Sequence, residues 1–219
     1  DEIEKAKATM DENTYKTEFL ADFVSTGSRA AYNFDRKIHV KQAEELTANL
    51  FWGMDFNVMH MTSVLGCSYS DGSIHYFDEI RQSNSNTEQL AIAMKKIAPG
   101  INIYPDATGS ARSTTSNKSD HQILIDHGFN VIAKKVNPPI IDRINALNRM
   151  LVDANGKVRM TVDPKCTYLI KDLEQVQRSR DGKIEKLKDI TLSHAFDACS
   201  YYIALTNPLV KRSVMSSQW

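Results

Sequence analysis

Cysteine, long apolar runs and net charge are all scarce in this sequence. Its 219 residues include Cys67, Cys166 and Cys199, an odd number without metal-ligand spacing, so we expect reduced thiols in a cytosolic protein. A membrane-spanning helix needs a run of about 18 apolar residues. This sequence contains no such run, and we therefore expect no membrane partner. The pattern GxxxxGK[ST] is missing, because residues 25–30, STGSRA, lack its lysine, which excludes a P-loop nucleotide site in this chain.

The composition is that of an ordinary globular protein, with 42% hydrophobic and 25% charged residues, and the length suits one domain with appendages. The formal net charge is zero, but residues 134–188 hold 13 Lys and Arg against 7 Asp and Glu. This surplus indicates either a polyanion partner on one part of the molecule or a solvated basic surface without a partner.

The first residues, DEIEKAKATM, contain neither an initiator Met nor a signal-peptide core. We therefore expect a piece of a longer protein or a processed chain. Phe19, Leu20, Phe23 and Val24 fall at helical spacing, and residues 1–24 are predicted to be helical.

The rest of the chain predicts an α/β fold with a mixed β-sheet flanked by helices, because hairpin strands come first and strands and helices alternate later. Asp71-Gly72 between two alternating apolar runs predicts a hairpin, with a break near 57–60 separating a further strand. A second hairpin is expected at Asn155-Gly156, and residues 41–50 are expected to form a short helix or turn. Further strands are expected at 101–106 and 129–135, a loop at 107–118, and helices at 87–98, 119–128, 138–153, 166–177 and 192–207, the first two capped by Asn86 and Ser119.

Three aspartates lie in apolar surroundings, where a lone carboxylate is costly to bury. Asp55 lies in the apolar run WGMDFNV, and Asp106 ends the strand INIYPD. Asp197 lies on an apolar helix with His194 three residues earlier, so both side chains project from one helical face.

Each aspartate alone is readily explained as a cap or a turn former. Together, carboxylates at the ends of adjacent strands and one from a packed helix can converge on one point, where they repel unless hard cations lie between them. Oxygen ligands with one imidazole select Mg²⁺ or Mn²⁺ rather than zinc. Two such ions about 3.5–4 Å apart are the arrangement that hydrolyses phosphodiesters.

The order and context of these motifs resemble the nuclease domain of the large terminase subunit of tailed bacteriophages, an RNase H-like fold. The resembling segments are GMDFN around Asp55, YPDATGS around Asp106, and the H-x-x-D pair His194 and Asp197. NVIAKK with the following IIDRINAL, and TYKTEFLADFV near the start, extend the resemblance over residues 14–207. In this sequence Phe56, not a small residue, follows the first Asp, which departs from the family pattern.

The resemblance implies an endonuclease that cuts concatemeric double-stranded viral DNA during genome packaging, using two Mg²⁺ or Mn²⁺ ions and little sequence preference. It implies a linker helix at 1–32 from an N-terminal ATPase motor, a nuclease domain at 33–210 and a tail at 211–219. The small terminase subunit and the portal would be further partners, in the host cell cytoplasm.

Within this hypothesis Asp55 bridges both ions, Asp106 and Asp197 each hold one, and His194 ligates or orients a water. The ordinary alternative for His194 is a helix histidine bonded to a neighbouring backbone carbonyl. We expect the lysines of the NVIAKK segment to face the DNA backbone, with further cations extending this basic track. The expected DNA-binding residues are Lys134, Lys135, Arg112, Arg143, Lys157 and Arg159, with Arg149 as a further candidate.

Other functions stay open at this point. A different RNase H-like nuclease, such as a Holliday-junction resolvase, would share the acidic cluster but prefer branched DNA. A DNA- or protein-binding module with a degenerate cluster would not cleave DNA, and a structural domain would use the aspartates as caps. Asp78 and Glu79 on the second hairpin strand are extra acidic candidates, expected mostly at the surface, and Trp52 is expected in the core.

Overall fold

A computed structural model describes residue 10 and residues 29–111, 118–179, 183–184 and 189–208. Six strands form one sheet in the order β5-β4-β1-β2-β3-β6. β1 pairs antiparallel with β2, and β2 with β3, whereas β1 and β4, β4 and β5, and β3 and β6 pair in parallel. The strands are β1 (Leu50–Asp55), β2 (His60–Ser68), β3 (Ile74–Ser83), β4 (Asn102–Pro105), β5 (Asn130–Val131) and β6 (Met160–Val162).

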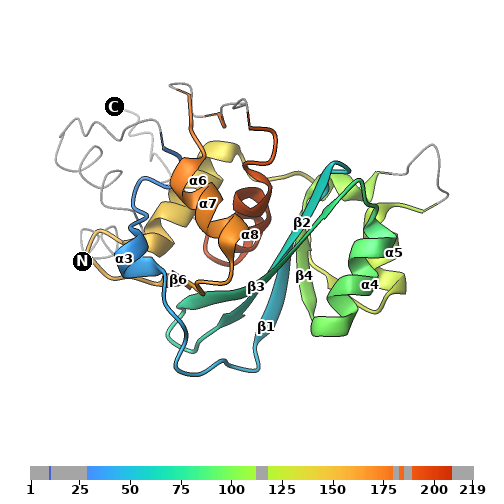
Figure 1. The fold of residues 1–219 in the computed structure, drawn as a ribbon, viewed down its shortest axis with the longest axis horizontal. Helices are drawn as coiled ribbons and strands as arrows, with labels where there is room; N and C mark the ends of the chain where they lie inside the picture. The colour runs from blue at the N-terminus through green and yellow to red at the C-terminus, as the bar shows by residue number, and fades with distance from the viewer. Residues whose placement is uncertain (1–9, 11–28, 112–117, 180–182, 185–188, 209–219) are drawn as a thin grey trace, which may run out of the picture.

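Helices cover the sheet on both sides, as Figure 1 shows, with α6, α7 and α8 on one side and α4 and α5 on the other. The predicted N-caps are confirmed, because Asn86 and Ser119 accept hydrogen bonds from backbone N–H groups of the helices they precede. The described helices are α3 (Arg36–His39), α4 (Thr87–Ile97), η1 (Ala107–Ser110), α5 (Asp120–Asp126), α6 (Ile140–Leu151), α7 (Thr167–Gln175) and α8 (His194–Thr206). The predicted mixed sheet flanked by helices is therefore confirmed.

The central strand β1 divides the core by the alternation of its side chains. Trp52 and Met54 pack in the cluster under α4 and α5, which confirms Trp52 as a core residue. Phe51 packs in the other cluster, with α6, α7 and α8. Gly53 and Asp55 lie on the same face of β1 as Phe51, so the pleat directs Asp55 toward α8.

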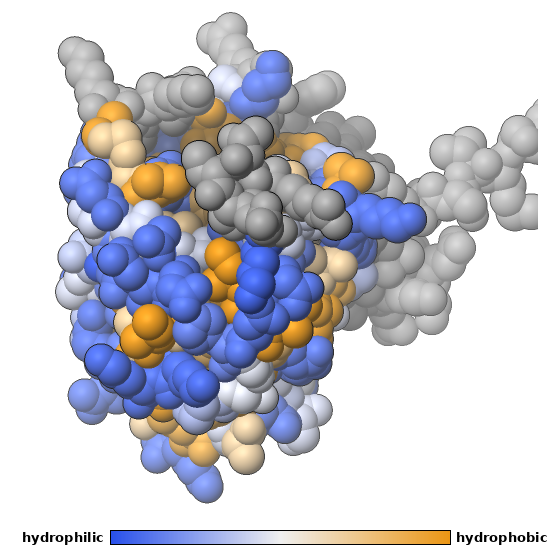
Figure 2. All heavy atoms as spheres, turned by 90° about the vertical axis from the view of Figure 1, so that its right-hand side faces the viewer, coloured by the Kyte–Doolittle hydropathy of each residue, from blue (hydrophilic) through white to orange (hydrophobic). Residues whose placement is uncertain are grey.

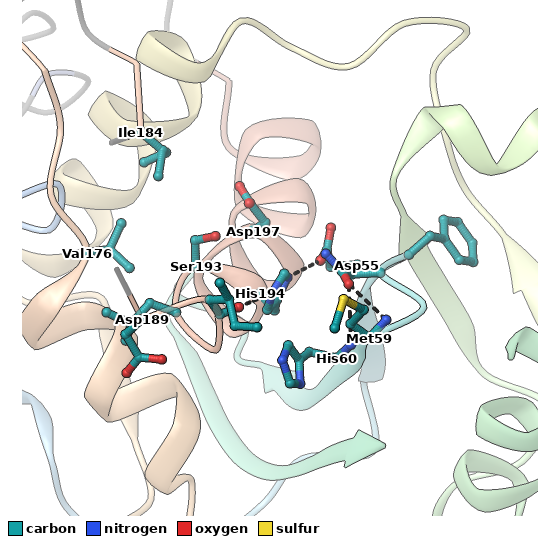
Figure 3. Close-up of a pocket in the computed structure, with 13 residues that line it drawn as sticks. Asp55, Met59, His60, Val176, Ile184, Asp189, Ser193, His194 and Asp197 are labelled. Carbon is teal, nitrogen blue, oxygen red and sulfur yellow. Dashed lines mark hydrogen bonds and ion pairs between the residues drawn. The ribbon is translucent and has the colours of Figure 1, made fainter. Parts of the chain in front are cut away.

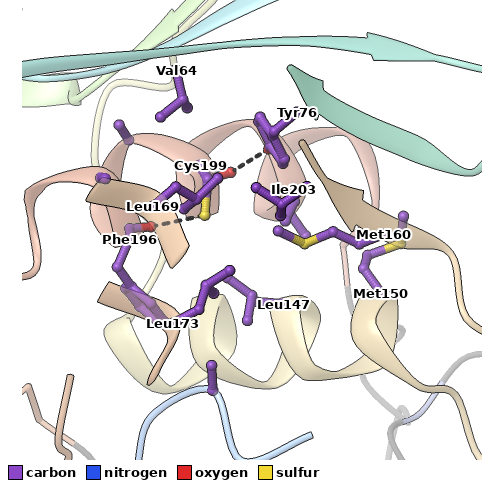
Figure 4. Packing of buried hydrophobic residues seen from close by; sticks show 14 of the residues in the cluster. Val64, Tyr76, Leu147, Met150, Met160, Leu169, Leu173, Phe196, Cys199 and Ile203 are labelled. Carbon is purple, nitrogen blue, oxygen red and sulfur yellow. Dashed lines mark hydrogen bonds between the residues drawn. The ribbon is translucent and has the colours of Figure 1, made fainter. Parts of the chain in front are cut away.

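The larger core cluster joins the sheet to α6, α7 and α8, as the packing in Figure 4 shows. The Tyr76 hydroxyl donates to the Cys199 carbonyl at 3.1 Å, which satisfies the only polar atom of that buried side chain. Cys67, Cys166 and Cys199 are buried free thiols. On the side of the molecule that bears α4 and α5, hydrophobic residues are scattered among hydrophilic ones (Figure 2).

Several local predictions differ from the structure. The strand expected over 129–135 spans only Asn130–Val131, and the loop expected over 107–118 begins with the short helix η1. Residues 41–49 form no helix and run as an irregular segment into β1. Asn155-Gly156 does turn the chain, with Gly156 at φ +76°, but no second hairpin follows, because β6 pairs in parallel with β3. The helix predicted over 1–24 lies outside the described residues, apart from residue 10. None of the described helices is both long and apolar enough to cross a membrane.

Gly53 sets how closely α8 approaches the sheet. A Cβ atom built there would lie 2.2 Å from the Ala198 carbonyl oxygen, which is backbone and cannot rotate away. The absence of a side chain at Gly53 therefore allows α8 to lie directly on β1.

We predict that Gly53→Ala lowers the free energy of unfolding by about 1–3 kcal/mol, because the added methyl group overpacks this contact. Amide hydrogen exchange in α8 should also accelerate. Gly72→Ala is the matched control: its φ of +80° in open space strains the backbone, at a cost of about 1–2 kcal/mol. Equal exchange in α8 for the two variants would contradict the role of Gly53.

Candidate active site

The candidate site lies at the carboxyl ends of the two central parallel strands. Asp55 is the last residue of β1, and Asp106 follows β4 directly. The Asp106 N–H donates to the Met54 carbonyl at 3.1 Å, which fixes the two strand ends side by side. Helix α8, which contacts both β1 and β4, supplies the third aspartate, Asp197.

Asp55 and His194 form a direct contact. The His194 Nδ1 atom lies 2.9 Å from Asp55 Oδ2, and its Nε2 lies 3.1 Å from the Ile190 carbonyl oxygen (Figure 3). Burial opposes the charged form of His194, but the hydrogen bond and attraction from Asp55 outweigh it and raise the pKa of His194. The backbone-carbonyl contact of an ordinary helix histidine is therefore present together with a contact to the first aspartate.

Asp197 is held by a buried arginine. Arg143 on α6 donates from one terminal nitrogen to Asp197 Oδ1 at 2.6 Å and to the Ser200 hydroxyl at 2.7 Å. Burial raises the pKa of Asp197 to about 6; Arg143 opposes this rise, whereas the charge of Asp55 adds to it. Asp55 and Asp197 therefore lie near enough for their negative charges to repel each other.

Asp106 is held by neutral donors instead. Its Oδ1 accepts from the Thr108 N–H and the Asn137 amide, both at 2.7 Å, and its Oδ2 accepts from the Tyr201 hydroxyl at 2.8 Å. Burial alone would raise the pKa of Asp106, but these hydrogen bonds lower it. Asp106 is therefore both the cap of η1, as one alternative explanation proposed, and a carboxylate linked to α8.

The donor set suits hard divalent cations. Among the hydrogen bonds of the described residues, Asp55 uses only Oδ2 and Asp197 only Oδ1, which leaves one carboxylate oxygen of each for a cation. Repelling carboxylates with one nearby imidazole are the oxygen-rich ligands that Mg²⁺ and Mn²⁺ prefer. In the described part of the chain no three His, Cys, Asp or Glu side chains are already arranged around one metal position, so the metal-binding roles stay predictions.

A cavity of about 390 Å³ opens beside these groups. Asp55, His194 and Asp197 line it together with His60, whose ring centroid lies 5.6 Å from that of His194 (Figure 3). Its remaining wall is largely apolar and includes Val176, Ile184, Ile190 and Leu192. The carboxylates thus face an accessible hollow that a substrate could enter.

The basic residues are spread differently from the prediction. Lys134 and Lys135 are exposed in the segment between β5 and Asn137, at the same sheet edge as Asp55 and Asp106. Arg143 is only 5% exposed and neutralises Asp197, so it does not belong to an exposed basic track. Arg149 is also buried and donates to the Asn207 carbonyl.

Lys157 and Arg159 lie at the opposite end of the sheet, where they contact Asp71 in the β2–β3 turn. The strand register places this turn beside the start of β1, far along the strand from Asp55. These two residues therefore cannot continue a track that begins at Lys134. Arg112 lies outside the described residues.

Sequence reasoning missed three site residues: Tyr201, Asn137 and Arg143 in its role as ion-pair partner. Tyr201 follows His194 by seven positions and Asp197 by four, so helical periodicity alone could have placed it on the same face of α8. Its ring also packs under the Arg143 guanidinium, 4.6 Å from the ring centroid.

The acidic candidates on β3 have structural roles. Glu79 is half-buried and accepts from the Tyr168 and Leu169 N–H groups at 2.7 and 2.9 Å, which caps the start of α7. Asp78 forms an ion pair with Lys165. Neither lines the cavity beside Asp55.

We predict that Arg143→Met lowers the free energy of unfolding by about 3–5 kcal/mol at pH 8, because it leaves a buried carboxylate unpaired. Asp197 has a folded pKa of about 6, above its ordinary value of 3.8. The folded protein therefore takes up this proton as the pH falls through 6, and removing Arg143 raises the pKa further. Protonation relieves the unpaired charge, so the loss should shrink at pH 5.

Urea unfolding of both proteins at the two pH values measures this difference, with exposed Lys134→Met as the control that should change little. An equal loss for Arg143→Met at pH 5 and pH 8 would show that Asp197 is not its partner.

A family model described as the terminase RNaseH-like domain matches residues 52–205. No curated protein sequence matches this chain. The large terminase nuclease domain of P22 is 17% identical, with a TM-score of 0.64, over 83% of this chain and 94% of its own. The large terminase of a thermophilic bacteriophage is 14% identical, with a TM-score of 0.69, over 93% of this chain and 51% of its own.

A third solved structure, the g2p large terminase nuclease domain of bacteriophage SPP1 with bound Mn, is 15% identical with a TM-score of 0.49, over 77% of this chain and 97% of its own. At such identities the first two likenesses establish the fold. The family model describes this domain as RNaseH-like, which confirms the predicted class. The family model spans well over half of the sequence and includes Asp55, Asp106, His194 and Asp197. The chain therefore belongs to the terminase family, of which it carries the RNase H-like nuclease domain.

Proposed function

We propose that this chain is a metal-dependent endonuclease that cleaves concatemeric double-stranded viral DNA during genome packaging. One observation carries the proposal: Asp55, His194 and Asp197 meet at one cavity at the carboxyl end of β1, beside Asp106. Membership of the terminase family supports DNA as the substrate.

Asp55, Asp106 and Asp197 are the residues that would hold two Mg²⁺ or Mn²⁺ ions. Both ring nitrogens of His194 are occupied by Asp55 and the Ile190 carbonyl, so His194 holds Asp55 in place and would ligate an ion or orient a water only after giving up one of these contacts. When bound, such a pair of ions supplies an activated water and stabilises the leaving oxygen of a phosphodiester. The free oxygens of Asp55 and Asp197 and the repulsion between these carboxylates support this assignment.

The chain's own contribution is to position these groups. The Ile190 carbonyl accepts from His194 Nε2 and thereby orients the opposite nitrogen, Nδ1, toward Asp55. Arg143 holds Asp197 by one oxygen, and Tyr201 holds Asp106 by one oxygen. Arg143 lies near the start of α6, and Tyr201 lies on α8. These two packed helices therefore fix the carboxylates before substrate arrives.

We propose that Lys134 and Lys135 contact the DNA backbone. They lie in the segment that leads to Asn137, which binds Asp106. An exposed pair of lysines beside a carboxylate site would attract the phosphates that the carboxylates alone repel.

In the whole protein we propose an N-terminal ATPase motor, with the small terminase subunit and the portal as partners in the host cell cytoplasm. This chain matches about half of the length of the large terminase from the thermophilic bacteriophage. That coverage supports a further domain, the proposed motor, in the complete protein.

We predict that Asp55→Asn reduces Mn²⁺-dependent cleavage of linear plasmid DNA by about 100-fold or more, since several kcal/mol of charge stabilisation is lost. Asp71→Asn is the control, because Asp71 lies in an exposed turn at the other end of the sheet. The assay is a gel time course with Mg²⁺, Mn²⁺ or EDTA. Cleavage by Asp55→Asn at the wild-type rate would refute the proposed site, and no cleavage by the wild type would favour a degenerate module.

We also predict that Lys134→Ala with Lys135→Ala weakens DNA binding uniformly across sequences. The slope of log affinity against log salt should fall by about 0.9 for each phosphate that the variant no longer neutralises. Fluorescence anisotropy at several salt concentrations measures it, with Lys157→Ala as the exposed control at the far end of the sheet. An unchanged slope in the double variant would remove these lysines from the interface.

A further inference from the structure

We propose that Asp172, on α7, is a positioning residue that fixes the first turn of α8, and with it His194 and Asp197, against Asp55. The inference rests on the proposed function, because it concerns the groups assigned there. It is carried by the way in which α8 begins.

Helix α8 has no cap of its own. The residue before it, Ser193, has φ +78°, and its side chain makes no capping hydrogen bond. A left-handed conformation at a residue with a side chain is strained, and the first N–H groups of a helix need acceptors from elsewhere. The turn that carries the site residues therefore depends on another element.

Asp172 supplies the acceptor. Its Oδ2 accepts from the Ala195 N–H at 2.9 Å and from the Phe196 N–H at 3.0 Å. These two residues lie between His194 and Asp197, and Asp172 is 1% exposed. A single buried oxygen thus holds the backbone between two proposed ligands.

The same oxygen lies where a negative charge is costly. Burial raises the pKa of Asp172 to about 6, despite the hydrogen bonds from Phe196 and Ala195 and the attraction of Arg81. The hydrogen bonds to α8 and the attraction of Arg81 thus offset only part of the cost of burying this carboxylate.

The consequence for the site is direct. The His194 ring must reach Asp55 Oδ2 and the Ile190 carbonyl at once, at 2.9 and 3.1 Å. If the first turn of α8 frays, the His194 ring loses this orientation. The rest of α8 stays packed on β1.

Glu79 offers a matched control within the same chain. It caps α7 as Asp172 caps α8, with two hydrogen bonds from backbone N–H groups, but α7 carries none of the proposed ligands. Asp172→Ala and Glu79→Ala should therefore cost similar stability and differ at the site. Asp172→Asn keeps an oxygen that can accept the Ala195 and Phe196 N–H bonds but loses the second acceptor oxygen, which weakens the hydrogen bond from the Ser193 N–H, so it should keep the His194 orientation at some cost in stability.

The experiment compares these three variants with the wild-type 219-residue chain, well below their melting temperatures. The readouts are Mn²⁺ binding by calorimetry and the His194 ring ¹⁵N shifts by NMR without metal, assigned with His194→Gln. For Asp172→Ala we expect Mn²⁺ affinity to fall about tenfold or more and the His194 ring shifts to move. For Glu79→Ala we expect neither change.

The proposal is overturned if folded Asp172→Ala keeps the wild-type His194 shifts, or if Glu79→Ala moves them equally. It is also overturned if Asp172→Asn loses the His194 orientation although its fold is intact. If the wild type binds no Mn²⁺ and cuts no DNA, the proposed function fails, while the metal-free shifts still decide whether Asp172 positions His194.

Discussion

The close contact between β1 and α8 is the constraint on which the site depends. Gly53 lets the Ala198 carbonyl approach the strand, and the pleat then turns Asp55, two residues later, toward the helix. Helical periodicity places His194, Asp197 and Tyr201 on the face that α8 presents there. Strand and helix thus bring acidic groups together that lie about 140 residues apart in the chain.

The electrostatics of the site follow from this proximity. Two partly buried carboxylates that repel each other would destabilise the fold, but each has a partner that offsets the repulsion: His194, when protonated, beside Asp55 and Arg143 beside Asp197. Each pair occupies one carboxylate oxygen and leaves the other available. The folded chain can therefore exist without metal and still present oxygen ligands to it, which a site with fully neutralised carboxylates could not do.

The sequence singled out the aspartates because each is an exception to its local pattern: a carboxylate within an apolar strand, at a strand end or on an apolar helix. Arg143 could not be assigned in the same way, because an arginine on an amphipathic helix looks the same whether it faces solvent or a distant aspartate. The failed second hairpin shows the same limit. The Asn155-Gly156 turn forms locally, with Asp153 accepting from the Asn155 and Lys157 N–H groups, but the partner of β6 is β3, which no short-range signal specifies.

The starts of α7 and α8 are held by carboxylates that belong to other elements of the fold. Glu79 on β3 holds the start of α7, and Asp172 on α7 holds the start of α8. Arg81 attracts both carboxylates and packs over the Tyr168 ring at 4.2 Å, which joins the two caps electrostatically. Backbone N–H groups are directional donors, so such caps fix helix orientation more tightly than apolar contacts alone. Each carboxylate fixes the helix whose first N–H groups it accepts, so the proposed ligands on α8 depend on Asp172 of α7, whereas Glu79 of β3 fixes only the start of α7.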